Sequence, residues 1–311
     1  MSRVTAPWRA RVALVVPALL VAVASSGAAA AGTASAANHR QCATATLSGT
    51  YLFAGDGFSI SGGARTPLAF AGSERFDGAG HVAGTNSFSV GGVVTRRAGF
   101  TGAYTLAANC AGTLTIGSDL HFDLYASPSG DQFAYVQTDA GTVSTTTEHR
   151  VSRKTSPQSC STATLSGAYL FTSNGFSISG GAQTPFAFAG IDRLDGAGTD
   201  HSIVSANVGG AITRQESGTG TYTVAADCTG TLAFGDSELF DLYVSPDGDV
   251  FVDTETDPGS VTFETEVRST GELAGGGPAS RAGPLPTHSR ADRLAGGRTV
   301  DQWRPWRPLV R

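Results

Sequence analysis

The chain lacks the residue patterns by which many enzymes and metalloproteins are identified. It contains no cofactor-binding fingerprint, no cluster with metal-ligand spacing and no recognisable catalytic constellation. Charged residues make up only 15% of the sequence, methionine occurs once, and no stretch has the 3.6-residue period of an amphipathic helix. Glycine, by contrast, occurs 41 times. A charge-poor chain rich in glycine, serine and threonine indicates an all-β protein, for which we predict no cofactor and no catalytic residue.

The only long apolar run lies near the N-terminus. Arginines precede an apolar stretch at residues 12–24, and small residues follow it as far as Ala34-Ser35-Ala36. The apolar part is shorter than the roughly 20 residues that span a bilayer, and the order of segments is typical of a secretory signal peptide. We therefore predict a signal peptide at residues 1–36 and a secreted, extracellular protein that could associate with the cell surface.

Two copies of one unit make up the rest of the chain. The stretch Leu47 to Gly63 returns almost letter for letter as Leu165 to Gly181, and the alignment continues without a gap. Each copy has the size of a small domain with its own core. The domain prediction is one repeat at residues 42–153 and a second at residues 159–269.

The four cysteines follow the repeat. Cys42 and Cys110 of the first copy correspond to Cys160 and Cys228 of the second. Four cysteines allow three connectivities, and only pairing within each copy treats the copies alike. Disulfides Cys42–Cys110 and Cys160–Cys228 are the favoured scheme and agree with export. A zinc site is the alternative, but no CxxC or HxxxH spacing supports it.

Within a copy the hydrophobic pattern has period two and is interrupted by glycine-containing turns. It predicts eight or nine short antiparallel strands, with separate strands at residues 93–97 and 101–107 of the first copy. Such strands can form a closed up-and-down barrel or a two-sheet sandwich. The short turns and the removal of exposed edges favour the barrel. The predicted fold is all-β, with two tandem small antiparallel up-and-down β-barrels and two-sheet sandwiches as the alternative.

Charge is distributed unevenly along the chain. The first copy has eight acidic residues and six arginines, whereas the second has fifteen acidic residues and three arginines. The acidic second copy argues against nucleic acid as a partner. Residues 270–311 are rich in glycine, proline and arginine, which predicts a disordered basic tail. This tail could adhere to an anionic cell-surface polymer or a membrane surface. The oligomeric state is not predicted.

Metal and histidine sites find little support. No histidine inside one copy has a histidine at the equivalent position of the other. The acidic run Asp247, Asp249, Asp253, Glu255 and Asp257 has neither octahedral nor EF-hand spacing. We therefore predict no metal site, with a calcium site in this run as the less favoured alternative.

The candidate binding residues come from an acidic residue on an otherwise apolar strand face. Glu74 occupies such a position, and Asp192 repeats it in the second copy. A buried acid needs a partner, and Arg150 of the last strand is the predicted one, able also to stack on the ring of Tyr51. Such a cluster could close one barrel end as a salt-bridged plug or bind a ligand. The candidate ligand-binding residues are Tyr51, Glu74 and Arg150, with Tyr169, Asp192 and Arg268 in the second copy.

Two resemblances to known families follow from these residues. Gly49-x-Tyr51 together with Arg150 resembles the Gly-x-Trp motif and closing arginine of calycin-type barrels, the lipocalin and avidin relatives, with tyrosine in place of tryptophan. The pattern LSGTYLF, FDGAG and TGAYTLAANCAGTL, within Cys42 to Arg268, is similar to a family of uncharacterised exported bacterial proteins that has been likened to barrels of the allene oxide cyclase and dirigent type. The resemblances imply a barrel fold and assign no catalytic residue.

Three functions are compatible with this reading. The first is non-catalytic binding of a small, largely apolar ligand by an exported barrel protein. The second is an isomerase or cyclase of the allene oxide cyclase type, in which a shaped pocket acts by positioning. The third is a cell-surface structural or adhesion protein with filled barrels.

Overall fold

The computed structural model describes residues 41–154, 159–236 and 238–269. The predicted signal peptide at residues 1–36 and the predicted tail at residues 270–311 lie outside the described residues.

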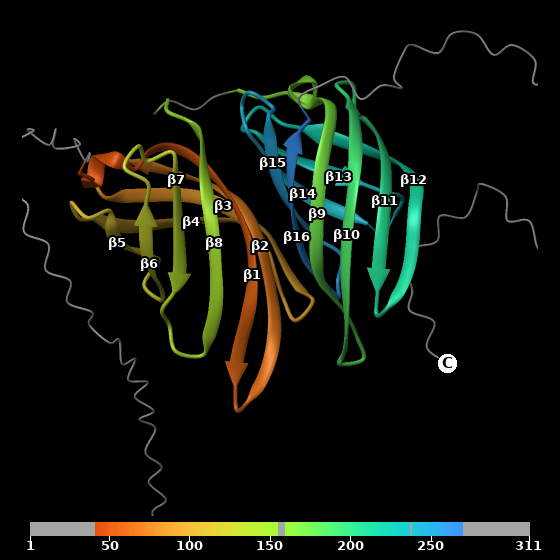
Figure 1. Ribbon diagram of the computed structural model, residues 1–311, viewed down its shortest axis with the longest axis horizontal. Coiled ribbons are helices and arrows are strands. Elements are labelled where there is room, and N and C mark those ends of the chain that lie inside the picture. The colour runs from red at the N-terminus through yellow and green to blue at the C-terminus, as the bar shows by residue number, and fades with distance from the viewer. Residues whose placement is uncertain (1–40, 155–158, 237, 270–311) are drawn as a thin grey trace, which may run out of the picture. The chain divides into compact units, whose positions relative to one another are not determined.

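The first repeat forms a closed antiparallel barrel in which each strand pairs with the next along the chain and β8 pairs with β1 (Figure 1). A short 3-10 helix, η1 (Thr44–Thr46), precedes it. The strands are β1 (Ser48–Ser61), β2 (Ala64–Asp77), β3 (His81–Val90), β4 (Val93–Leu106), β5 (Ala111–Ile116), β6 (Leu120–Ala126), β7 (Gln132–Gln137) and β8 (Thr142–Ser152).

The second repeat forms a closed barrel with the same topology, in which β16 pairs with β9 (Figure 1). Its 3-10 helix is η2 (Thr162–Thr164). The strands are β9 (Ser166–Ser179), β10 (Ala182–Asp195), β11 (Thr199–Val208), β12 (Ala211–Val224), β13 (Thr229–Ala233), β14 (Leu239–Val244), β15 (Val250–Glu255) and β16 (Ser260–Arg268).

The predicted tandem barrels are confirmed, and one strand boundary is corrected. Residues 93–97 and 101–107, predicted as two strands, belong to the single strand β4 apart from residue 107. Arg97 takes a positive φ of 47°, and the register between β3 and β4 shifts between Asn86 and Phe88. A β-bulge of this kind bends a strand without ending its pairing. The local break in alternation therefore marks a bulge and not a turn.

Tight turns reverse the chain direction between neighbouring strands. In the turn between β2 and β3, the Asp77 carboxylate accepts hydrogen bonds from the backbone amides of Ala79 and His81, at 2.7 and 3.0 Å. Gly78 and Gly80 have positive φ values of 77° and 107°, which glycine adopts without steric cost. The second repeat has the same arrangement around Asp195.

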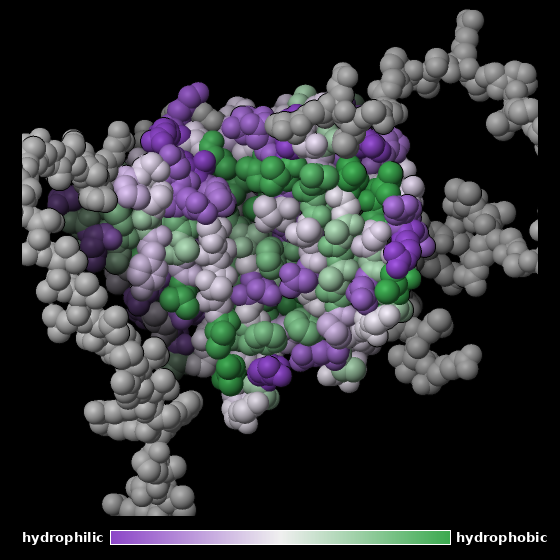
Figure 2. Space-filling view, in the orientation of Figure 1, coloured by the Kyte–Doolittle hydropathy of each residue, from purple (hydrophilic) through white to green (hydrophobic). Residues whose placement is uncertain are grey.

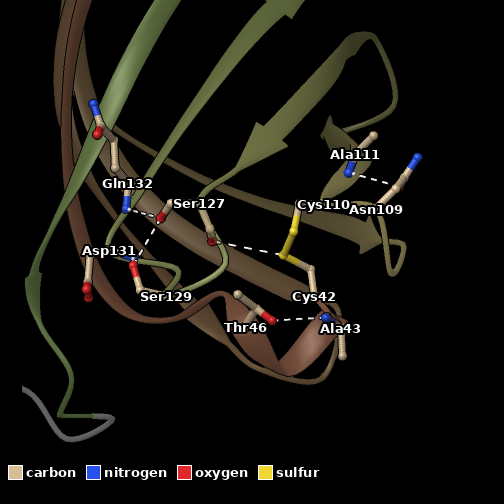
Figure 3. The surroundings of a disulfide bond; sticks show 10 residues. All are labelled: Cys42, Ala43, Thr46, Asn109, Cys110, Ala111, Ser127, Ser129, Asp131 and Gln132. Carbon is tan, nitrogen blue, oxygen red and sulfur yellow. Dashed lines mark hydrogen bonds between the residues drawn. A yellow bond between two sulfur atoms is a disulfide. The ribbon is translucent and has the colours of Figure 1, made fainter. Parts of the chain in front are cut away.

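Both predicted disulfides are present, Cys42–Cys110 and Cys160–Cys228. Figure 3 shows Cys42, which precedes β1, joined to Cys110 of the turn before β5. The Cys42 sulfur also lies 4.0 Å from the carbonyl oxygen of Ser127, which follows β6. The disulfide thus ties the N-terminal segment to the turns of one barrel end, which we call the closed end. In each barrel this end holds the start of the first strand and the end of the last.

The hydrophobic core of each barrel lies toward its closed end. In the first barrel the Tyr51 ring makes edge-on contacts with Phe76 and Phe133, at centroid distances of 5.2 and 5.3 Å. In the second barrel Tyr169 makes the equivalent contact with Phe251, at 5.3 Å. Period-two alternation produces this core because every second side chain of a barrel strand faces inward.

On the face shown in Figure 2, hydrophobic and hydrophilic side chains are interspersed over the strands. Several large apolar side chains on the outward faces are exposed, among them Val93, Tyr125 and Ile212. Within the described ranges, no helix is long and apolar enough to cross a membrane.

Candidate functional site

An arginine and a tyrosine close one end of the first barrel. The guanidinium carbon of Arg150 lies 5.4 Å from the centroid of the Tyr51 ring, and Arg150 Nε donates to Tyr51 Oη at 2.9 Å. Tyr51 in turn donates to the carbonyl oxygen of Gly130. Arg150 also donates to the carbonyl oxygen of Thr46 at 2.7 Å and forms an ion pair with Asp131 at 3.1 Å. The predicted stacking of arginine on tyrosine is confirmed.

The second barrel repeats this closure. The Arg268 guanidinium carbon lies 5.2 Å from the Tyr169 ring centroid, and both side chains donate to the carbonyl oxygen of Gly248, at 2.7 and 2.6 Å. Arg268 also forms an ion pair with Asp249 at 3.2 Å. Neither Tyr169 nor Arg268 lines the cavity described below. Their role, and that of Tyr51 and Arg150, as ligand contacts stays a prediction.

The predicted pairing of Glu74 with Arg150 is wrong, as is that of Asp192 with Arg268. The donors of each arginine reach chain segments at the closed end, where Asp131 and Asp249 supply the carboxylates. The acidic side chains lie deeper in the barrel, beside other carboxyl groups.

In the first barrel, Glu74 of β2 interacts with Glu148 of β8, and both are buried. Burial raises the pKa of Glu74 to about 7, and the interaction with Glu148 partly offsets this. Burial and the neighbouring Glu74 raise the pKa of Glu148 well above its usual range, while the Tyr135 hydroxyl lowers it. The two carboxyl groups disfavour each other's ionisation, so the pair retains a proton more strongly than two separate carboxyl groups would.

In the second barrel this pair is expanded to five buried carboxyl groups. Asp192 of β10 and Glu266 of β16 occupy the positions of Glu74 and Glu148. Asp200 of β11, Asp253 of β15 and Glu264 of β16 are added to them, at positions where the first repeat has Val82, Tyr135 and Thr146. All five are inward-facing and at most 7% exposed.

Burial is the main cause of the perturbed pKa values in this cluster, and mutual repulsion adds to it. The pKa of Asp192 is raised to about 7 and that of Asp200 to about 8. The pKa values of Asp253, Glu264 and Glu266 are raised well above the usual range. Oxygen-only clusters of this kind suit hard cations such as calcium.

Beside this cluster the second barrel contains a cavity of about 810 Å³. Asp192 and Glu264 contribute to its lining, and its wall carries five aromatic rings: Phe171, Phe186, Phe188, Phe234 and Phe240. It extends to the barrel end opposite the closed end, because the lining also includes Gly209, Pro258 and Gly259 of the turns there. Four more carboxyl groups line the cavity: Glu216, Glu238, Glu255 and Asp257.

One substitution between the repeats removes a large inward side chain from the second barrel. In the first barrel the Phe100 ring packs against Phe53 at 6.1 Å and occupies the space above Gly84, where an added Cβ would come within 2.4 Å of it. The second repeat has Gly218 in place of Phe100 and Ser202 in place of Gly84. The loss of a phenyl group leaves volume that the backbone of a closed barrel cannot collapse to fill.

Sequence reasoning named Asp192 and missed the other four carboxyl groups of the second cluster. The available signal was the alternation of inward-facing and outward-facing side chains along each strand. Asp253 alternates in step with Phe251, and Glu264 and Glu266 alternate in step with Arg268, so all three are inward-facing. The acidic run that contains Asp253 was interpreted from linear spacing, which hides this alternation.

Comparison with known proteins does not place the chain in a family. No protein-family model and no curated protein matches it. The solved structures that resemble it include a protein of unknown function from the DUF3598 family of Nostoc punctiforme and a candidate AttH protein of Nitrosomonas europaea. The first is 13% identical in sequence, and the aligned region covers 72% of this chain and 97% of the Nostoc chain, with a TM-score of 0.24. The second is 7% identical and covers 71% and 92%, with a TM-score of 0.23. At these TM-scores neither likeness bears on fold or function.

Proposed function

We propose that this protein is an exported, non-catalytic binding protein whose second barrel holds a small, largely apolar ligand. The observation that carries the proposal is the cavity of about 810 Å³ in that barrel, which falls in the size range of small-molecule sites. The two disulfides support export, because such bonds persist in oxidising compartments. The cavity also argues against the filled-barrel alternative for the second repeat.

The lining indicates the chemistry of the ligand. Phe186 and Phe188 lie side by side on β10 with ring centroids 4.8 Å apart, and offer an apolar wall. Burial raises the pKa of Glu238 to about 8 and that of Glu255 to about 7, each beside further carboxyl groups. A ligand with an apolar body and a cationic group would satisfy both features, because its charge would stabilise the ionised acids and contact aromatic faces.

Extraction of the purified, disulfide-bonded protein with organic solvent, followed by mass spectrometry, tests the proposal. We expect a co-purifying amphiphilic compound at about one equivalent per chain. The Gly218→Phe variant restores the aromatic side chain of the first barrel and should abolish that binding. Gly99→Phe is the matched control, because Gly99 is exposed and has no atom within 4 Å of an added Cβ. Clean extracts, together with no thermal shift across a library of amphiphilic amines, would refute the proposal.

A second candidate is an isomerase or cyclase of the allene oxide cyclase type, which is supported by one feature. Asp192 lines the cavity, and burial raises its pKa to about 7, which suits a general acid or base at neutral pH. Under this candidate, Asp192→Asn would retain the ligand and abolish its isomerisation. Recovery of an unchanged ligand after incubation with the wild-type protein would favour binding alone.

A further inference from the structure

Three carboxyl groups of the second barrel converge on one point. Asp253 on β15 lies directly opposite Glu264 on β16, and Glu266 follows two residues later on the same inward face. One oxygen atom from each of the three lies within 4.8 Å of those from the other two. All three side chains are buried.

In its ionised form this arrangement is unfavourable unless a proton or a cation compensates the charge. Like charges directly opposite each other on neighbouring strands destabilise a sheet, and a buried carboxyl group without a partner costs several kcal/mol. Among the residues that the structure describes, no arginine, lysine or histidine forms an ion pair with Asp253, Glu264 or Glu266. Both carboxyl oxygens of Asp253 and of Glu266 also lack a hydrogen-bond donor.

A second observation points to the same place from other strands. Asp192 on β10 and Asp200 on β11 are also buried, and each has a carboxyl oxygen with no hydrogen-bond partner. Both carboxyl groups interact with Glu266. Carboxyl groups of β10 and β11 therefore interact with the three-carboxyl group in addition to those of β15 and β16.

The first barrel shows that the fold does not require this cluster. Its positions aligned with Asp253 and Glu264 hold Tyr135 and Thr146. The Thr146 hydroxyl donates to the carbonyl oxygen of Ala54. The same topology is therefore built with a single carboxyl pair, and the added acids of the second barrel need an explanation other than folding.

We propose that Asp253, Glu264 and Glu266 bind a hard divalent cation, with calcium as the expected ion, at the inner end of the cavity in the second barrel. Asp192 and Asp200 add further negative charge around the bound ion. Glu238, Glu255 and Asp257, which we assign to ligand binding, line the same cavity nearer its open end.

The donor set selects the class of ion. Calcium is held by six to eight oxygen atoms at about 2.3–2.6 Å, so two oxygens on one ion can be up to about 5 Å apart. Three carboxylates supply as many as six oxygens, and water from the cavity can supply more. Neither a histidine nor a cysteine belongs to the cluster, which disfavours zinc and the softer transition metals.

The cavity also provides a route for the ion. Glu264 and Asp192 line it, so an ion that enters from the open end meets one of the three proposed ligands, Glu264, at the cavity wall. Because binding of calcium requires no organic ligand, this proposal stands or falls separately from the ligand-binding function.

The test is a calorimetric titration of calcium chloride into the full, disulfide-bonded protein after treatment with EDTA. We expect binding of a single ion and an increase in the unfolding temperature when calcium is present. The double variant Asp253→Asn, Glu264→Gln should weaken calcium binding by more than about tenfold, since metal affinity depends on the number of charged ligands. These amides keep the shape of the acids and remove their repulsion, so the variant should still fold.

Glu148→Gln is the matched control, because Glu148 occupies the position of Glu266 in the first barrel. It should leave calcium affinity unchanged. A wild-type protein that shows neither heat of binding nor a thermal shift with calcium would overturn the proposal. Equal calcium affinity in the wild type and the double variant would overturn it as well, because the ion would then bind elsewhere.

Discussion

Arg150 lies over the ring of Tyr51 and donates a hydrogen bond to its hydroxyl group. Arg268 lies over the ring of Tyr169, and both side chains donate to the carbonyl oxygen of Gly248. The first strand and the last strand of each barrel are thereby joined at the closed end. Each guanidinium also donates a hydrogen bond to a backbone carbonyl oxygen at this end, that of Thr46 in the first barrel and that of Gly248 in the second. This interaction holds each barrel closed at the point where the chain enters and leaves it.

Replacing the closing arginine should destabilise the barrel that contains it. We expect Arg150→Ala to lower the free energy of unfolding of the first barrel by about 2–4 kcal/mol, because several buried acceptors lose their donor. Arg150→Lys should recover only part of this loss, since lysine cannot match the planar donor geometry. Urea unfolding followed by circular dichroism measures the effect. An unchanged unfolding midpoint in Arg150→Ala would contradict the role assigned to this residue.

Removing one disulfide should weaken one barrel more than the other. The double variant Cys42→Ala, Cys110→Ala removes the disulfide of the first repeat. Loss of this loop closure should lower the free energy of unfolding by roughly 4 kcal/mol, because the unfolded chain regains conformational entropy. The matched variant Cys160→Ala, Cys228→Ala should have a similar effect on the second repeat. Thermal unfolding by calorimetry, with and without reductant, provides the measurement. Insensitivity of the wild-type protein to reductant would count against a stabilising role.

The buried pair Glu74 and Glu148 should make the first barrel less stable as the pH rises. Burial raises the pKa of Glu74 to about 7, above its usual value of 4.5. Between these values the folded form holds a proton that the unfolded chain has released, so stability is fully present below pH 4.5 and falls up to pH 7. The variant Glu74→Gln should therefore be more stable than the wild type at pH 8, with little difference at pH 4.

Unfolding temperatures of both proteins between pH 4 and pH 8 test this prediction. The comparison reports the pair, because replacing Glu74 also removes its effect on the pKa of Glu148. Parallel curves across the whole range would show that Glu74 ionises normally in the folded state.

A glycine at the start of β1 should be irreplaceable. Gly49 has a φ of 99°, and a Cβ added to it would lie 2.0 Å from the carbonyl oxygen of Ser152. Both the backbone conformation and the contact exclude a side chain, so Gly49→Ala should cost about 2–4 kcal/mol or prevent folding. Gly99→Ala is the control and should change stability by less than about 0.5 kcal/mol, since nothing lies within 4 Å of its added Cβ. Soluble yield and unfolding midpoint of the two variants provide the comparison.

The amino-acid sequence by itself determined the architecture of the described barrels. Period-two alternation specifies which side chains face inward, glycine-containing turns specify antiparallel neighbours, and the repeat specifies that Cys42 pairs with Cys110 as Cys160 pairs with Cys228. These features depend on local geometry or on symmetry between copies. The signal-peptide and tail predictions remain expectations, because they concern residues outside the described ranges.

Only the tertiary structure decided which inward-facing side chains meet. Alternation assigns Glu74, Glu148 and Arg150 to the interior, but it does not assign them to a level along the barrel axis. That level depends on strand tilt and on the register at which β8 meets β1, which are properties of the closed barrel. Barrel closure places Arg150 against Tyr51, and it brings Asp253 and Glu264 together with Asp192 from strands far apart in the sequence.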